Sequence, residues 1–323
     1  MRSPANGPVE ETKPNPPAAQ FVPRQRGRGA MRGLMAATYS TILYETPAEG
    51  VARVVMNRPD ARNAQNLDMT YELNDAFDRA VADDAVKVVI LAGADPHFSA
   101  GHDLRDTAEK KLGRDFPVVS TWGGFEDAGA EGRYAREQEI YLQNTRRWRN
   151  LSKPTIAQVQ GKCLAGGLML AWACDLIVAS DDATFCDPVV AMGVCGVEWF
   201  VHPWELGARK AKEMLWTGDS WTAEEARSFG MVNHVVAREK LADFTLALAG
   251  RIASKPTFAV KTVKEAINRT LDIQGQNSAI EQAFGLHHLC HAHNMMKFGV
   301  IVDPSGLHPS VRSRIDPSLN KKS

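Results

Sequence analysis

The chain has 323 residues, of which 44% are hydrophobic and 24% charged, which is ordinary for a globular protein with a sizeable core. Lysine plus arginine and aspartate plus glutamate both number 38, so the formal net charge is +0 and we expect no nucleic-acid partner. No apolar run is long enough to span a bilayer, so we expect no membrane partner, and five cysteines without a C-x-x-C pair favour reduced thiols in a cytoplasmic protein.

Residues 1–37 differ in composition from the rest of the chain. They are rich in proline, glycine and arginine and contain Phe21 as their only aromatic residue. A segment with so little apolar surface cannot offset the entropy lost on ordering, so we predict a disordered extension. It also lacks the apolar stretch of a secretory signal.

Strand and helix patterns alternate after this extension. The predicted strands are residues 38–46, 51–57, 86–93, 155–161 and 175–180. The last three are near-continuous apolar runs, which is typical of strands buried on both faces. An amphipathic helix is predicted over residues 66–82, and another helix opens at the Gly-Gly pair 166–167. This alternation predicts an α/β fold with right-handed crossovers and a mostly parallel sheet.

The last third of the chain has a helical pattern. The stretch TAEEARSFG begins with a capping box that joins Thr222 to Glu225. A long helical stretch over residues 256–298 is expected to break near Gly275. The domain organisation we expect is an extension over 1–37, a core over 38–220, a helical region over 221–300 and a loose tail over 301–323.

A segment over about residues 105–150 interrupts the alternation. It is far longer than the ~4–6 residues typical of a connection between elements. Its middle contains Trp122 and Phe125 among several glycines, and its end has a helical pattern. Such a segment is often a lid or the wall of a pocket, and a plain surface insertion is the alternative.

Two loops are distinctive because each joins a strand to a helix through small residues. The first loop is HFSAGHDL (residues 97–104) and the second loop is CLAGGLML (residues 163–170). In a parallel sheet both turns lie at the carboxyl ends of the strands, and a helix N-terminus leaves free N–H groups with a partial positive charge. Side by side, the two turns can direct two N–H groups at one oxygen and so form an oxyanion hole.

Five motifs, in this order, resemble the crotonase (enoyl-CoA hydratase/isomerase) superfamily: MNRPDARNA, FSAGHDL, AGGLMLAWACDLIVAS, ATFCDP and TGDSWTAEEARSFGMVNHVV. The resemblance implies a crotonase-like spiral of ββα units over 38–220, with the insertion near the acyl pocket and a C-terminal helical trimerisation region. It also implies an acyl-CoA thioester as ligand, no cofactor beyond the coenzyme A of that substrate, and a homotrimer or homohexamer.

The resemblance further assigns residues to the site. The two oxyanion donors fall on the backbone N–H groups of His102 and Gly166. Residues beside His102 would line the path of coenzyme A; they are Ala100, Gly101, Asp103 and Leu104. Arg62 and Ala64 would lie near the nucleotide end of coenzyme A.

The chain departs from the hydratase pattern at two decisive positions. Hydration of an enoyl thioester needs a group that activates water and a group that protonates the α-carbon. Hydratases of the superfamily use two glutamates for these tasks, whereas this chain has Met169 and Val189 at those positions. Both residues would line the substrate site as apolar side chains, so any proton transfer needs another residue.

Two acids are candidates for that task. Asp187 lies two residues before Val189 and on the same side of an extended segment, but a turn role beside Pro188 is the alternative. Glu198 lies among apolar residues in another glycine-bearing loop and is slightly favoured, with a structural role as its alternative. His202 is a further candidate, with a packed or capping role as the alternative. The thiols of Cys186 and Cys195 could attack a thioester, but no activating histidine is placed by spacing, so we expect both to be core thiols.

The stretch HHLCHAH (residues 287–293) places His287 and His291 four residues apart, which is a metal-ligand spacing on a helix. No carboxylate completes a ligand set, so we expect a structural or subunit-contact role and no metal site.

The sequence therefore predicts an enzyme that processes acyl-CoA, most similar to enoyl-CoA hydratases, and that stabilises a thioester enolate with the His102 and Gly166 N–H groups. Hydrolysis, isomerisation or decarboxylation on the same fold stays open, as does a non-catalytic protein that binds acyl-CoA.

Overall fold

The computed structural model describes residues 38–105, 111–307 and 312. The predicted disordered extension over 1–37 lies outside the described residues, and so does most of the predicted loose tail. Within the described ranges, no helix combines the length and the apolar character needed to cross a membrane.

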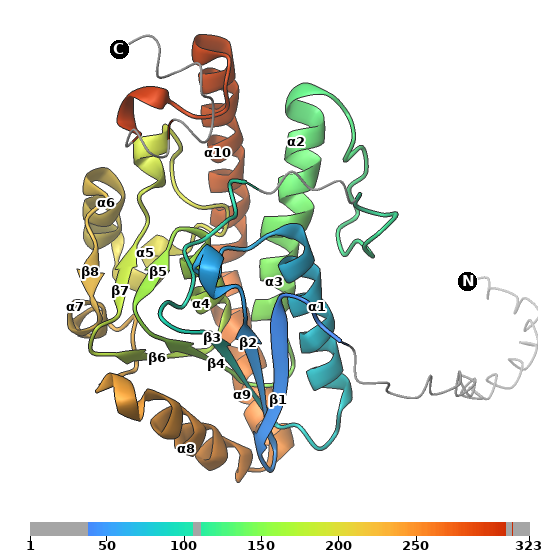
Figure 1. Cartoon of the computed structure of the whole chain (residues 1–323), viewed down its shortest axis with the longest axis vertical. Helices are drawn as coiled ribbons and strands as arrows, with labels where there is room; N and C mark the ends of the chain where they lie inside the picture. The colour runs from blue at the N-terminus through green and yellow to red at the C-terminus, as the bar shows by residue number, and fades with distance from the viewer. Residues whose placement is uncertain (1–37, 106–110, 308–311, 313–323) are drawn as a thin grey trace, which may run out of the picture. The chain divides into compact units, whose positions relative to one another are not determined.

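A six-stranded sheet forms the centre of the described structure, with strand order β1-β2-β3-β4-β6-β9 (Figure 1). β1 and β2 form an antiparallel hairpin, and the remaining neighbours pair in parallel. The prediction of a mostly parallel sheet is therefore confirmed. The strands are β1 (Ile42–Ala48), β2 (Val51–Met56), β3 (Val88–Gly93), β4 (Thr155–Val159), β6 (Leu176–Ser180) and β9 (His234–Val236).

A smaller three-stranded sheet was not predicted from the sequence. Its strands are β5 (Lys162–Leu164), β7 (Thr184–Cys186) and β8 (Trp221–Thr222), in the order β5-β7-β8. Segments of two or three residues are too short to show a two-residue period, so the sequence carries no signal for them. β5 belongs to the second loop, and its Cys163 bridges Ser99 of the first loop.

Helices cover both faces of the six-stranded sheet (Figure 1). α8 (Leu241–Ala253) packs on one face, and α1 (Leu67–Ala82) and α4 (Gly166–Ala173) pack on the other. Alternate residues of β3 face opposite layers: Val88 and Ile90 pack with the α8 side, whereas Val89 and Leu91 belong to the larger core on the other face. This double burial explains the continuous apolar run of this strand.

The helical region follows the pattern of the sequence. The capping box between Thr222 and Glu225 is present at the start of α7 (Ala223–Ser228). Gly275, with φ 98°, separates the two long C-terminal helices as predicted. These helices are α9 (Thr257–Ile273) and α10 (Gln276–Phe298), and the shorter helices of this part are α5 (His202–Leu206), α6 (Ala208–Thr217), η4 (Arg238–Lys240) and η5 (Pro304–Gly306).

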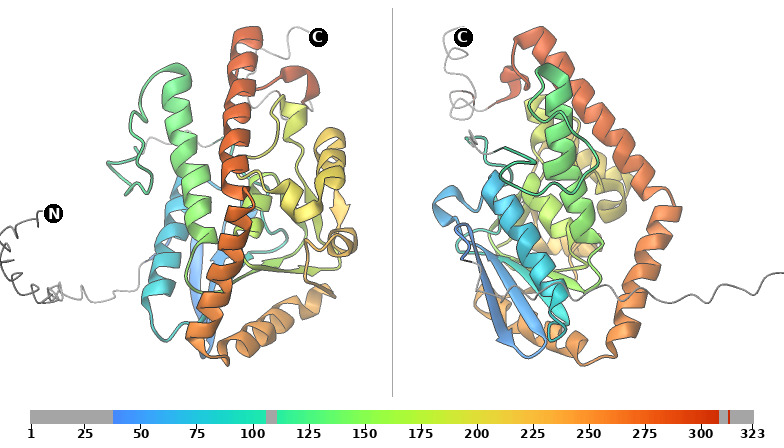
Figure 2. Two further views of the ribbon diagram at one scale, coloured as in Figure 1. Left: turned by 180° about the vertical axis from the view of Figure 1, so that it is seen from behind. Right: turned by 90° about the vertical axis from the view of Figure 1, so that its right-hand side faces the viewer.

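The end of the insertion is helical, as the sequence predicts, whereas residues 111–128 form an irregular and mostly exposed loop. α2 (Gly129–Glu137) continues through the π-helical stretch η2 (Gln138–Gln143) into α3 (Asn144–Arg149), and α2 contacts α10 (Figure 2). The fully buried Glu139 accepts hydrogen bonds from the Val119 N–H (2.9 Å), the Ser120 N–H (2.7 Å) and the Tyr71 hydroxyl (2.6 Å). One carboxylate thus fixes the preceding loop against α1.

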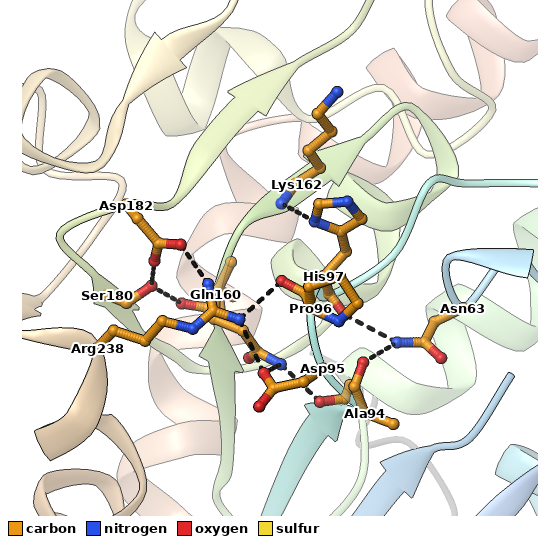
Figure 3. A network of polar contacts seen from close by, with 12 residues as sticks. Asn63, Ala94, Asp95, Pro96, His97, Gln160, Lys162, Ser180, Asp182 and Arg238 are labelled. Carbon is orange, nitrogen blue, oxygen red and sulfur yellow. Dashed lines mark hydrogen bonds and ion pairs between the residues drawn. The ribbon is translucent and has the colours of Figure 1, made fainter. Parts of the chain in front are cut away.

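A polar network holds the turn between β3 and the first loop (Figure 3). Asn63 Nδ2 donates to the carbonyls of Ala94 (2.7 Å) and His97 (2.8 Å). Arg238 Nη2 donates to the Pro96 carbonyl at 2.8 Å. Because these bonds satisfy the carbonyls of an irregular turn, the start of the first loop is fixed relative to the sheet.

A cavity of about 330 Å³ lies between α9 and the core. Its lining includes the residues Trp172, Glu205, Val263 and Ile267. Burial raises the pKa of Glu205 to about 7, although nearby Arg149 acts to lower it. Glu205 is therefore an acid that folding keeps protonated above its ordinary titration range.

We expect Glu205 to make the folded state less stable as the pH rises. Because its folded pKa is raised, its favourable contribution is full below the unfolded value and is lost as the pH rises through about 7. Relative to Glu205→Gln, the wild-type free energy of unfolding should fall by roughly 2–3 kcal/mol between pH 5 and pH 8. Urea unfolding at both pH values measures this change, and a difference independent of pH would contradict it.

Candidate active site

The first and second loops meet through their backbones. The Gln65 N–H donates to the Gly101 carbonyl and the Asp103 N–H donates to the Gln65 carbonyl, both at 2.8 Å. Gln65 Nε2 also donates to the Gly166 carbonyl at 2.9 Å. A single buried glutamine therefore ties the strand-like first loop to the start of α4.

Glycine is required where the two loops touch. A Cβ atom on Gly101, which has φ 89°, would lie 2.9 Å from the Gly166 nitrogen. A Cβ atom on Gly166 would lie 3.2 Å from the His102 nitrogen. Neither the His102 N–H nor the Gly166 N–H donates to another group of the described chain. Two N–H donors without a partner in the described chain thus lie close together, which is the arrangement that an oxyanion hole requires.

The backbone before α4 adopts an unusual conformation. Ala165 has φ 46° and ψ −116°, and its N–H donates to the Cys186 carbonyl at 2.9 Å. A non-glycine residue at positive φ is costly and persists only where its surroundings impose it. Here the turn presents the N-terminus of α4, with its partial positive charge, to the same space as the His102 N–H.

The His102 side chain packs into the site. Its ring stacks on Tyr141 of η2, with ring centroids 3.7 Å apart and an interplanar angle of 10°. Burial lowers the pKa of His102, although Glu198 acts to raise it, so the imidazole is neutral at neutral pH. The insertion therefore contributes an aromatic wall beside the oxyanion donors.

Glu198 is the carboxylate that contacts this histidine. Its side chain is 6% exposed, and its Oε1 lies 3.8 Å from His102 Nδ1 and 3.7 Å from His287 Nε2. Both distances exceed a hydrogen bond, so neither contact consumes the acceptor capacity of the carboxylate. Glu198 thus lies next to the predicted oxyanion residue with lone pairs left for a water molecule.

Asp187 lies in a different environment. It is fully buried, and its carboxylate accepts from His202 Nε2 (2.9 Å), the Val197 N–H (3.1 Å) and the Val189 N–H (3.3 Å). These donors occupy both carboxylate oxygens. Asp187 therefore anchors the loop that carries Glu198, and its geometry matches the structural alternative that the sequence leaves open.

We expect Asp187→Ala to lower the free energy of unfolding by about 3–5 kcal/mol, because it leaves buried donors without an acceptor. Asp187→Asn should cost less, since the amide oxygen still accepts, and should keep kcat near the wild-type value. Urea unfolding and steady-state kinetics measure both effects. Wild-type stability combined with a large loss of kcat in Asp187→Asn would instead give Asp187 a catalytic role.

The remaining predicted residues differ in their exposure. Met169 is 2% exposed within the core, and Val189, on η3 (Val189–Met192), packs against the same core.

Among the residues expected along coenzyme A, Asp103 forms an ion pair with Arg58 at 2.9 Å. Ala64 and Gly101 are buried, Ala100 is partly buried, and Arg62 and Leu104 are exposed. Arg62 follows the short helix η1 (Pro59–Ala61).

Comparison with known sequences decides the family. Residues 46–128 and 120–302 match the model of the family described as enoyl-CoA hydratase/isomerase. The chain belongs to this family. The crotonase fold and the family membership expected from the sequence are therefore confirmed.

Other members of the enoyl-CoA hydratase/isomerase family are similar over most of their length. EchA13 of Mycobacterium tuberculosis, whose name is "putative enoyl-CoA hydratase", is 48% identical over 260 residues, which are 79% of this chain and 82% of the relative. A crotonyl-CoA hydratase of Syntrophomonas wolfei is 34% identical over 77% of this chain and 90% of its own. The crystal structure of a probable enoyl-CoA hydratase from Mycobacterium smegmatis has a TM-score of 0.73 at 46% identity and covers 81% of this chain and 99% of that one.

The expectation that no carboxylate accompanies His287 and His291 is wrong. Glu137, at the end of α2, completes a group whose ligand atoms all lie within 4.8 Å of one another. The sequence could not reveal this group, because Glu137 is distant from the histidines in the chain and reaches them through the packing of α2 on α10.

The two candidate thiols are inert, as the sequence indicates. Burial raises the pKa of Cys186 to about 11 and that of Cys195 to about 12. A thiol that stays protonated at neutral pH is a poor nucleophile. Neither cysteine is therefore a candidate for attack on a thioester.

Proposed function

We propose that this crotonase-family chain is an enoyl-CoA hydratase that uses Glu198 as its single acid–base group. The observation that carries the proposal is the juxtaposition of two free N–H donors, on His102 and Gly166, with the buried Glu198 carboxylate 3.8 Å from the His102 ring. An oxyanion hole and an adjacent acid–base group are what addition of water to a conjugated thioester requires.

The proposed reaction begins with the thioester carbonyl oxygen at the two N–H groups. Water adds to the β-carbon while the carboxylate of Glu198 takes one of its protons, and the electron pair of the double bond moves toward the thioester oxygen. The resulting enolate is stabilised by the His102 and Gly166 N–H groups. Glu198 then returns the proton to the α-carbon, the carbonyl reforms, and the net change is the addition of one water molecule.

Met169 and Val189 support a mechanism with one carboxylate. Their side chains are apolar and pack with the core, so they leave Glu198 to carry both proton transfers. This chemistry needs no cofactor beyond the coenzyme A of the substrate.

The deciding experiment is turnover of short-chain enoyl-CoA by the purified protein, followed by the loss of the conjugated thioester absorbance. We expect hydration to the 3-hydroxyacyl-CoA. Release of free coenzyme A would indicate a hydrolase, and a shifted double bond would indicate an isomerase. Binding of the thioester without any turnover would favour the non-catalytic alternative.

We also propose that the chain works as a homotrimer or homohexamer in the cytoplasm. Apolar side chains on the two C-terminal helices support the assembly, because Phe258, Ile273 and Met296 are 80–90% exposed. Phe258 and Ile273 lie at opposite ends of α9, and Met296 lies near the end of α10, so the exposed apolar side chains are spread along both helices, as an extended interface would require.

A further inference from the structure

A cluster of histidines and a carboxylate joins α2 to α10 beside the site. His287 and His291 lie on successive turns of α10, and Glu137 ends α2. His287 Nε2 lies 3.5 Å and His291 Nε2 lies 3.8 Å from Glu137 Oε2. The three side chains are only 6–12% exposed. Three potential metal ligands therefore face one another in a nearly closed space.

Both histidines have the orientation of metal ligands. His287 Nδ1 lies 2.8 Å from the Gly196 carbonyl, and His291 Nδ1 lies 2.7 Å from the Ile301 carbonyl. A carbonyl only accepts, so each Nδ1 carries the proton. In a neutral ring the lone pair is then on Nε2, which is the atom that faces Glu137. Donation of the second ring N–H to a carbonyl is the usual support of a histidine that binds a metal.

The facing atoms are not satisfied by one another. Glu137 Oε2 and His287 Nε2 are buried and make no hydrogen bond within the described residues. The distances from Glu137 Oε2 to His287 Nε2 (3.5 Å) and to His291 Nε2 (3.8 Å) exceed the 2.7–2.9 Å of a charge-assisted hydrogen bond. They approach the roughly 3.4 Å that separates two ligands held about 2.1 Å from a tetrahedral ion.

From this geometry we propose that Glu137, His287 and His291 bind a divalent first-row transition ion, with Zn²⁺ as the ion to test. Two imidazoles and one carboxylate form a donor set that zinc and non-haem iron sites use, with further positions left for water. A carboxylate, two neutral rings and a divalent ion leave one positive charge, and Glu198, 3.7 Å from His287 Nε2, offsets it.

The site would fix the wall of the active site. Glu137 directly precedes η2, which carries both Glu139 and Tyr141, the ring that stacks on His102. An ion held by α2 and α10 would clamp this stretch in place. The inference does not depend on the proposed hydration, because ion binding is measured without substrate.

A proton is the alternative occupant of the cluster. Burial lowers the pKa of His287, but the contact with Glu137 outweighs it and raises that pKa to about 9, so a metal-free chain would hold a charged imidazolium there. Burial lowers the pKa of His288, 3.2 Å from the same oxygen, to about 4, so that ring stays neutral. A proton and a metal ion compete for Nε2 of His287.

The test is metal binding by untagged protein that has been treated with EDTA and freed of chelator. Calorimetric titration with ZnCl₂ should show saturable binding of one ion per chain. CoCl₂ should give visible d–d absorption that Zn²⁺ abolishes. The melting temperature should rise with Zn²⁺ concentration by mass action.

Glu137→Gln and His291→Ala should each weaken Zn²⁺ binding by more than the roughly 10–100-fold typical of losing a second-shell partner. Glu137→Gln preserves the side-chain shape, so it keeps the test valid if His291→Ala does not fold. His293→Ala, an exposed histidine on the same helix, is the matched control and should bind as the wild type does. The proposal is overturned by absence of saturable binding in the wild type, by unchanged binding in both ligand variants, or by loss of binding in His293→Ala.

Discussion

Glu198→Gln is expected to lower kcat for hydration of a short-chain enoyl-CoA by about 10²–10⁴-fold, with little change in KM. The amide keeps the shape of the side chain but cannot take a proton from water or return one to the α-carbon. Because Met169 and Val189 are apolar, neither side chain can take over the proton transfers from Glu198. Steady-state kinetics on the purified variant measure the effect.

Glu205→Gln is the matched control for this substitution. Glu205 is also an acid, and it is partly buried, but it lines the cavity beside α9 and is not part of the proposed site. Its replacement should leave kcat within about twofold of the wild-type value. If both variants kept full activity, Glu198 would not be the base, and a water molecule held by backbone groups would remain as the proton carrier.

The longer strands and helices could be predicted because each one has its own signal in the sequence, which the short strands of the second sheet lack. β3 shows a continuous apolar run, α7 shows its capping box, and the break between α9 and α10 shows a glycine. The loops could be predicted for a similar reason, since the glycines at 101 and 166 permit an approach that a Cβ atom would block. Local chemistry of this kind is visible without knowledge of the packing.

The partners of the site could not be predicted, because they come from distant segments. Tyr141 reaches His102 only because a π-helical stretch continues α2 into α3. Glu137 meets His287 only because α2 packs along α10. Spacing in the sequence contains neither contact, because the helical pattern predicted for the end of the insertion does not tell which elements that helix packs against.

The choice between the two acids also needed the structure. Asp187 and Glu198 lie in the same glycine-bearing region, and a position in the chain does not tell whether a carboxylate is already engaged. The carboxylate of Asp187 already accepts hydrogen bonds from His202 and from the Val197 N–H. The carboxylate of Glu198, in contrast, lies no closer than 3.7 Å to the rings of His102 and His287. The distinction rests on hydrogen bonding and not on residue type.

Gly166→Pro is expected to lower kcat/KM by about 10²–10³-fold, because it removes one of the two proposed donors to the enolate oxygen. Proline is tolerated at the first position of a helix, where Gly166 lies, since that N–H has no partner within the helix. The added side chain is a second perturbation, because a Cβ atom there would lie 2.5 Å from the His102 ring. Gly166→Ala brings the same Cβ atom but keeps the N–H, so the loss in Gly166→Pro beyond that in Gly166→Ala measures the donor. Circular dichroism on both variants checks that α4 and the rest of the fold persist. Equal activity of the two folded variants would mean that the Gly166 N–H does not stabilise the enolate.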